Sequence, residues 1–155
     1  SAPSGTFSGT GITDNGDGTA TFYPATAGVG GPYAITYSYT NGSGCSNSSS
    51  QNVTVNPLPV GSGSGQTICS GNVSNIALSS TISGTIFAWI ATQQSGAAVT
   101  GFSDGSGSTI AQTLNNASNT AGVISNSVTT TSSNGCDGAV FTVDVTVQAG
   151  LACRQ

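Results

Sequence analysis

The sequence predicts an all-β fold with two β-sandwich domains in tandem, and three observations lead to this prediction. Two runs, 34–40 and 141–147, alternate between apolar and polar residues, as strands with one buried face do. Gly, Asn and Ser residues, which are typical of turns, separate the apolar runs along the chain. No segment has a convincing apolar stripe at helical spacing, and only 110–117 is a candidate for a short helical turn.

The two alternating runs define the clearest strands. In the first, Ile35, Tyr37 and Tyr39 share one face, and in the second the same face is taken by Phe141 and the valines that follow at every second position. The polar residues between them are mostly Thr and Ser, which suit a solvent-facing side. Further strands are expected at 19–23, 51–56, 76–79, 85–91, 108–114 and 122–130.

The domain organisation follows from an internal repeat. Segments 37–55 and 127–147 both contain a strand, an Asn/Ser/Gly turn, a Gly-Cys pair and a strand ending in Val-Thr-Val, as expected for the closing hairpin of one domain type used twice. Two prolines at alternate positions and a Gly/Ser run follow the first copy and favour a linker. We therefore expect an incomplete domain at 1–57, a linker at 58–65 and a complete domain at 66–149.

The first domain is expected to be incomplete at its N-terminus because of its size. It has only about 57 residues and four or five strands, and below about 60 residues a domain buries too little surface to be more than marginally stable. The second domain has roughly seven strands at the spacing of an immunoglobulin-like sandwich.

The composition excludes most chemistry. The chain has no His, Lys or Glu, and its one basic residue is Arg154, so the usual general bases and the partners of nucleophilic triads are missing. We therefore predict that the chain is not an enzyme and needs no cofactor. The net charge of −4 argues against nucleic acid as a partner. No apolar run approaches the ~20 residues of a membrane-spanning helix, so membrane insertion is not expected.

Several separated blocks of the sequence resemble PKD-like repeats. These repeats occur in very large surface and secreted proteins of the Bacteroidetes, many similar to gliding and biofilm adhesins exported by the type IX secretion system. The resemblance covers nearly the whole chain. It implies Ig-like sandwiches, an extracellular or cell-surface location, and a spacer or adhesive role without catalytic residues. The blocks that carry it are S-G-T-F-S-G-T-G-I at 4–12, F-Y-P-A-T-A-G at 22–28, 33–39, G-C-S-N at 44–47, I-C-S-G at 68–71, F-A-W at 87–89 and N-G-C-D-G at 134–138.

The resemblance also bears on the two ends of the sequence. Similar domains begin with a Cys on an opening strand upstream of the Gly-Thr-Phe-Ser-Gly block, and segment 150–155 looks like such a strand. Either a continuous array extends past this sequence, or a tail of one subunit completes the first domain of the next by strand addition. An ordinary frayed end is the remaining alternative.

Four cysteines in a chain of extracellular character predict disulfides, with three possible pairings inside one molecule. We expect Cys69 and Cys136 to join the opening and closing strands of the second domain, with Trp89 as the core aromatic. By repeat equivalence, Cys45 and Cys153 are then expected to form bridges between neighbouring units. The alternatives are a bridge from Cys45 to Cys69, or two free thiols.

The segment 14–18, with the sequence Asp-Asn-Gly-Asp-Gly, is the one candidate metal site. Alternating Asp and Asn oxygens can converge on calcium, and Asp14 and Asp17 would be the ligands. Asn-Gly and Asp-Gly are also common hairpin-turn dipeptides, and we expect a turn here, with calcium as the alternative.

These observations predict a structural or adhesive repeat unit of an extracellular filament or giant cell-surface adhesin. Its expected partners are its own head-to-tail neighbours, with surface glycans as a further possibility. The alternative is a carbohydrate- or host-protein-binding β-sandwich module of a secreted protein, with residues such as Tyr33 and Asn115 in contact with the ligand.

Overall fold

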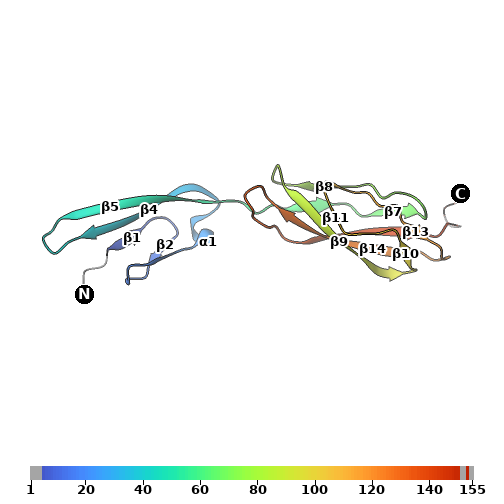
Figure 1. The fold of residues 1–155 in the computed structure, drawn as a ribbon, viewed down its shortest axis with the longest axis horizontal. Coiled ribbons are helices and arrows are strands. Elements are labelled where there is room, and N and C mark those ends of the chain that lie inside the picture. The colour runs from blue at the N-terminus through green and yellow to red at the C-terminus, as the bar shows by residue number, and fades with distance from the viewer. Residues whose placement is uncertain (1–4, 151–152, 154–155) are drawn as a thin grey trace. The chain divides into compact units, whose positions relative to one another are not determined.

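The computed structural model describes residues 5–150 and 153 and shows a chain built almost entirely of β-strands. The chain divides into two compact units, Ser1–Pro57 and Leu58–Gln155, which are described separately below and drawn in Figure 1. In the part of the chain that the structure describes, no helix is long and apolar enough to cross a membrane.

The first unit consists of a small sheet and a separate hairpin. The sheet has the order β1-β4-β5, and the hairpin is β2-β3. The long β4-β5 hairpin is antiparallel from Thr40 and Ser46 down to Gly30 and Val55. The elements are β1 (Thr6–Ser8), β2 (Ile12–Asp14), β3 (Ala20–Phe22), α1 (Pro24–Ala27), β4 (Gly30–Thr40) and β5 (Ser46–Val55).

The second unit is an Ig-like β-sandwich. A five-stranded sheet has the order β11-β9-β14-β15-β7, a three-stranded sheet has the order β12-β8-β6, and β10 pairs with β13. All pairs are antiparallel except β7 with β15, which is parallel. The strands are β6 (Gly61–Gly63), β7 (Gln66–Cys69), β8 (Ile76–Ser80), β9 (Ile86–Gly96), β10 (Val99–Thr100), β11 (Gly105–Ser106), β12 (Thr109–Ile110), β13 (Asn115–Asn116), β14 (Gly122–Thr131) and β15 (Phe141–Gln148).

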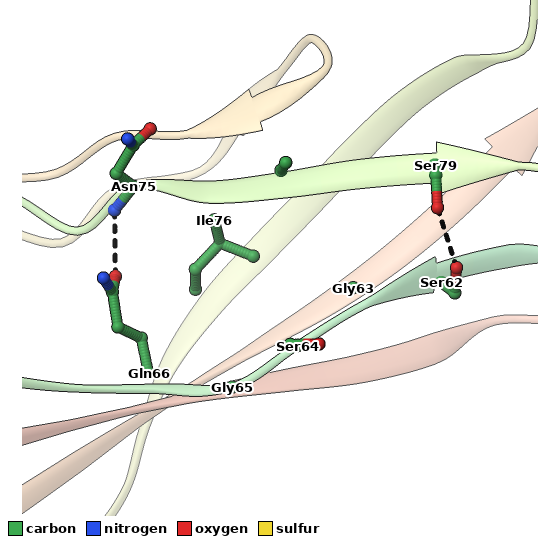
Figure 2. A pocket seen from close by; sticks show the side chains of 9 residues that line it. Ser62, Gly63, Ser64, Gly65, Gln66, Asn75, Ile76 and Ser79 are labelled. Atoms are coloured by element: carbon green, nitrogen blue, oxygen red, sulfur yellow. Dashed lines mark hydrogen bonds between the residues drawn. The ribbon is translucent and has the colours of Figure 1, made fainter.

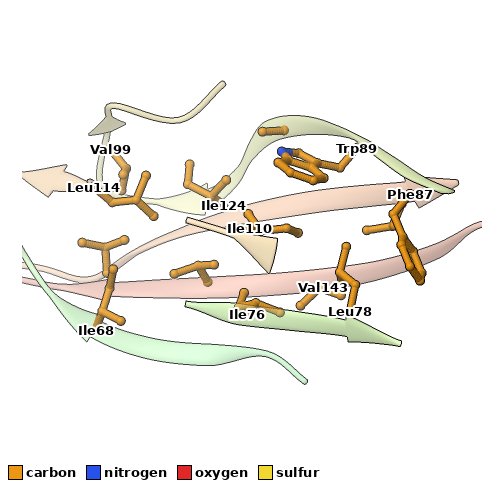
Figure 3. Close-up of a cluster of buried hydrophobic side chains, with 14 residues drawn as sticks. Ile68, Ile76, Leu78, Phe87, Trp89, Val99, Ile110, Leu114, Ile124 and Val143 are labelled. Carbon is orange, nitrogen blue, oxygen red and sulfur yellow. The ribbon is translucent and has the colours of Figure 1, made fainter. Parts of the chain in front are cut away.

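The core of the second unit lies between its two sheets (Figure 3). Every second residue is buried throughout β14, from Val143 onward in β15 and up to Ala91 in β9, as expected for a sheet with one covered face. Trp89 is only 8% exposed and its indole Nε1 donates to the Ser103 carbonyl at 3.3 Å. The prediction that Trp89 belongs to the core is confirmed.

The first unit has no comparable core. Among its described residues, 5–57, no hydrophobic side chain is buried, and Ile35 and the tyrosines of β4, like the valines of β5, are only half-buried. The contrast is clearest at the Val-Thr-Val triplets, because Val145 and Val147 are 0% exposed whereas Val53 and Val55 remain half-buried. The all-β prediction is confirmed for the chain, while two tandem Ig-like domains, the first incomplete, stay a prediction.

The prediction of a linker at 58–65 is wrong for most of this segment. Residues Gly61–Gly63 form β6, which pairs with β8, and Pro59 is fully buried. Glycine occupies alternate positions because the backbone runs directly over β15. A Cβ on Gly65 would lie 2.9 Å from the Asp144 carbonyl oxygen. Alternating Gly and Ser therefore indicate close packing here, although the same composition is typical of flexible linkers.

The expectation of a helical turn at 110–117 is also wrong. Burial alternates strictly through Ile110, Gln112, Leu114 and Asn116, which is a strand-like period and not a helical one. The strand expected at 108–114 is only two residues long, Thr109–Ile110. The helix that is present, Pro24–Ala27, begins with the proline that fits a first helical turn.

Candidate interaction surfaces

The two closing hairpins have the same turn. In one, the Asn41 and Gly44 amides donate to the carbonyls of Cys45 and Asn41, and in the other Ser132 and Gly135 bond to Cys136 and Ser132 in the same pattern. Gly44 and Gly135 both have a positive φ, 82° and 76°, which favours glycine. The repeat seen in the sequence is therefore also a repeat in backbone geometry.

The disulfide is different from the one predicted. Cys69 pairs with Cys153, with a Cα–Cα distance of 5.8 Å, and not with Cys136. Because β7 runs parallel to β15, Cys69 lies opposite Gln148 at the far end of that strand. Cys136 precedes the beginning of β15, and the strand is about 23 Å long at ~3.3 Å per residue. Two cysteines must have Cα atoms within about 7 Å to be bridged.

This bridge also corrects the second part of the cysteine prediction. Cys153 is bonded inside the chain, so it does not bridge to a neighbouring unit, and Cys45–Cys69 pairing is excluded as well. The rest of the segment 150–155, expected to be an opening strand or tail, lies mostly outside the described residues. Cys45 is an exposed free thiol and Cys136 a partly exposed one, and each lies on the turn of a closing hairpin.

A polar groove opens where β6 leaves β8 (Figure 2). The two strands pair from Gly61 to Gly63, and the chain then crosses to β15 as β7. The groove has a volume of about 410 Å³. It is bounded by two hydrogen bonds, between the Ser62 and Ser79 hydroxyls at 2.9 Å and from the Asn75 amide N–H to Gln66 Oε1 at 2.9 Å.

The groove is suited to neutral polar ligands. Its lining combines hydroxyl, amide and backbone groups with the apolar Ile76 and Ala77, and no charged side chain contributes to it. The pairing of β6 with β8 ends at Gly63. Beyond it, the backbones of 64–65 and 76–77 line the groove without being paired to each other. Sequence reasoning missed this site because 58–65 was interpreted as a linker.

A second hollow lies on the apolar face of the first unit. It measures about 250 Å³ and is lined by Tyr37 and Tyr39 of β4 and by 47–49 of β5. The Phe7 and Tyr37 rings pack with centroids 4.8 Å apart, and the Tyr37 hydroxyl accepts from the Gly5 amide at 3.0 Å. These aromatic rings thus form a surface that is only partly covered.

Asp14 and Asp17 each accept hydrogen bonds from different parts of the chain. Asp14 accepts from the amides of Phe7 at 2.6 Å and Gly16 at 2.8 Å. Asp17 accepts from the Thr19 hydroxyl at 2.5 Å and from the Thr19 amide at 3.0 Å. Both bonds lower the pKa of Asp17, the hydroxyl bond more strongly. Within 5–150 and at 153, no group of three metal-ligating side chains is found. The expected turn is present between β2 and β3, where Asp17 stabilises it and Asp14 also bonds to β1.

The two residues proposed for ligand contact have different surroundings. Tyr33 is half-buried and its hydroxyl donates to the Gly28 carbonyl at 3.3 Å. Asn115 is exposed on β13, opposite Thr100. Neither residue lines the polar groove or the aromatic hollow.

The chain was compared with known protein families and curated proteins. The sequence profile of the PKD-like domain family matches residues 66–150, which is more than half of the chain and includes nearly all of the sandwich core. No curated protein matches the chain.

Proposed function

The chain belongs to the PKD-like domain family, and from this premise we propose that it is a structural or adhesive repeat unit of an extracellular filament or giant cell-surface adhesin. PKD-like domains are typically non-catalytic structural modules and are commonly extracellular. The disulfide between Cys69 and Cys153 is consistent with an oxidising environment. In this proposal neighbouring units are joined head-to-tail, and the source is a Bacteroidetes-type surface protein.

The observation that carries the proposal is the duplicated closing hairpin. The same turn, the same Gly-Cys pair and the same Val-Thr-Val ending occur in both units of the chain. Repetition of one supersecondary unit is the sequence and structural signature of an array. The function of such an array is to span distance and to present surfaces, and neither needs a catalytic residue.

The surface chemistry also supports a unit that is exposed to proteases and to mechanical force. The chain has no Lys and a single Arg, so trypsin-like proteases have almost no cleavage sites. Low charge leaves little repulsion between neighbouring copies. Mechanical resistance then depends on the long ladders, of which β14 with β9 spans ten residue pairs, and on the disulfide.

The test is to locate the protein on intact cells of its source. Antibodies raised against the whole chain are applied to non-permeabilised cells and detected by immunogold electron microscopy. We expect gold particles in rows along surface filaments, and the rows should disappear when the gene is deleted. Labelling only after permeabilisation would contradict the proposal.

A second candidate, a carbohydrate-binding module, is favoured by the polar groove beside β6. Neutral hydroxyl and amide groups of the kind that line it are suited to hydrogen bonds with sugar hydroxyls. A glycan array with the whole chain tests this, with Ser79→Val as the variant and Ser46→Val on β5 as its control. Binding at micromolar concentration that only Ser79→Val removes would favour this candidate, and no binding would exclude it.

A further inference from the structure

The outer edges of the two closing hairpins differ. In the second unit, the edge of β15 is covered by β7, which pairs with it in parallel from Val145–Gln66 to Gln148–Cys69. In the first unit, β5 is the last strand in the order β1-β4-β5. No described segment of that unit takes the position that β7 has in the other. The hairpins match in turn and sequence, and they differ in whether a described strand pairs with the outer edge.

The open edge is long and unprotected. β5 spans ten residues, Ser46–Val55, without a charged residue or a proline. The edge strands of the second unit's two main sheets are two to four residues long. Proteins commonly protect sheet edges by short strands, charges or prolines. The second unit has short edge strands, whereas β5 is long and has neither charges nor prolines.

The adjoining side chains show what would cover this edge. In β7, Ile68 points into the core and is 8% exposed, while the neighbouring Thr67 faces solvent. At the equivalent place in the first unit, Val53 and Val55 are half-buried, and Val53 is paired with the half-buried Tyr33 of β4. A bound strand with one β-branched residue on this side would cover Val53 and Val55 in the way that Ile68 of β7 covers the core beside β15.

We propose that the outer edge of β5 at Val53–Val55 binds, in parallel, the opening strand of a neighbouring unit of the same kind. The strand would be short and uncharged, with a β-branched residue facing the valines, and its main chain would supply most of the binding. Within the described residues, the strand of this type, β7, is not the donor because it is paired with β15 and held by the Cys69 disulfide. The choice of donor rests on the proposed function, whereas the binding edge does not.

The experiment attaches the proposed strand covalently to the chain through a flexible linker. The full chain is extended at its N-terminus by a copy of 65–70 with Ser in place of the cysteine, through a Gly/Ser linker of roughly 15 residues, which gives a millimolar effective concentration. The matched control carries Asp in place of the strand's Ile. Amide hydrogen exchange of β5 is measured by NMR in both chains and in the unextended chain.

We expect exchange at Val53–Val55 to slow at least about tenfold with the Ile strand and to be unchanged with the Asp strand. Equal exchange in all three chains would overturn the proposal. Sedimentation of the unextended chain tests another occupant. Dimers that Thr54→Pro abolishes would show that β5 pairs with β5 of a second copy, and would overturn the parallel assignment. If the Ile strand protects β5 but the surface labelling fails, the outer edge of β5 is still a strand-binding site, and only the proposed filament function is contradicted.

Discussion

The two closing hairpins of this chain end in the same Val-Thr-Val triplet, yet the triplets have different surroundings. Val145 and Val147 are fully buried under a second sheet and beside β7. Val53 and Val55 belong to a three-stranded sheet whose apolar face is only half-covered. The local sequence sets the turn and the alternation in both cases. What the hairpin contributes to stability depends on the elements that pack on it.

The disulfide is expected to give the largest difference between the units. It closes a loop with a sequence separation of 84, for which the chain-entropy estimate is about 4.5 kcal/mol. The double change Cys69→Ser/Cys153→Ser should therefore lower the free energy of unfolding of the second unit by up to about 4.5 kcal/mol. Urea unfolding followed by the fluorescence of Trp89, the single tryptophan, reports on this unit.

Cys45→Ser/Cys136→Ser is the matched control for the disulfide. Both cysteines are free thiols, so we expect the urea midpoint of Trp89 fluorescence to stay unchanged. A loss of stability equal to that of the first double variant would contradict the observed pairing.

The triplets themselves allow a paired comparison. Val145→Ala removes two methyl groups from a fully buried side chain and should cost about 2 kcal/mol of unfolding free energy. Val53→Ala should cost less than half of this because its side chain is already partly exposed. Trp89 fluorescence measures the first change, and hydrogen exchange of β4 and β5 amides measures the second. Equal costs would show that the first unit has a core of its own.

A substitution in the Gly/Ser segment 61–65 is expected to lower the free energy of unfolding by a smaller amount. Gly65→Ala places a methyl group 2.9 Å from the Asp144 carbonyl oxygen, and relieving this contact should cost about 1–2 kcal/mol. Gly42→Ala, in open space on a turn, is the control. If Gly65→Ala were as neutral as Gly42→Ala in urea unfolding, the segment would behave as a linker and not as part of the sandwich.

The Asp14–Thr19 turn should give the smallest effect. The pKa of Asp17 is lowered in the folded chain, so its bonds to Thr19 are present above the pKa of an unfolded Asp and are lost as the pH falls through the lowered value. We expect the Thr19 amide resonance to shift only in that acidic range. Calcium at millimolar concentration should leave it in place at neutral pH, and a calcium-dependent shift would restore the metal interpretation.

The strands that alternate strictly were predictable. The runs 34–40 and 141–147 lie within β4 and β15, because one covered face is enough to impose a period of two. Trp89 was predicted as the core aromatic together with the Cys69–Cys136 bridge, and its core position is confirmed although that bridge is not formed. The turns were predictable from Asn, Ser and Gly, whose conformational preferences are local.

The strands whose identity depends on distant partners were not predictable. β6 has no apolar residue, and its glycines are needed only because Phe141, Thr130 and Val143 lie against them. The disulfide was mispredicted because the sequence does not show whether β7 runs parallel or antiparallel to β15. Parallel pairing moves Cys69 to the other end of the strand and away from Cys136. In both cases the deciding contacts join residues far apart in the sequence.

Hydrogen exchange at residue resolution on the unextended chain tests the contrast between the two hairpins most directly. The account predicts that β15 amides at Val145–Val147, where both β14 and β7 pair with the strand, are protected on both edges, with protection factors of at least about 10³. The β5 amides that point away from β4 should exchange almost as fast as those of an unstructured peptide. Equal strong protection along both sides of β5 would mean that its outer edge is already filled, and would contradict the account.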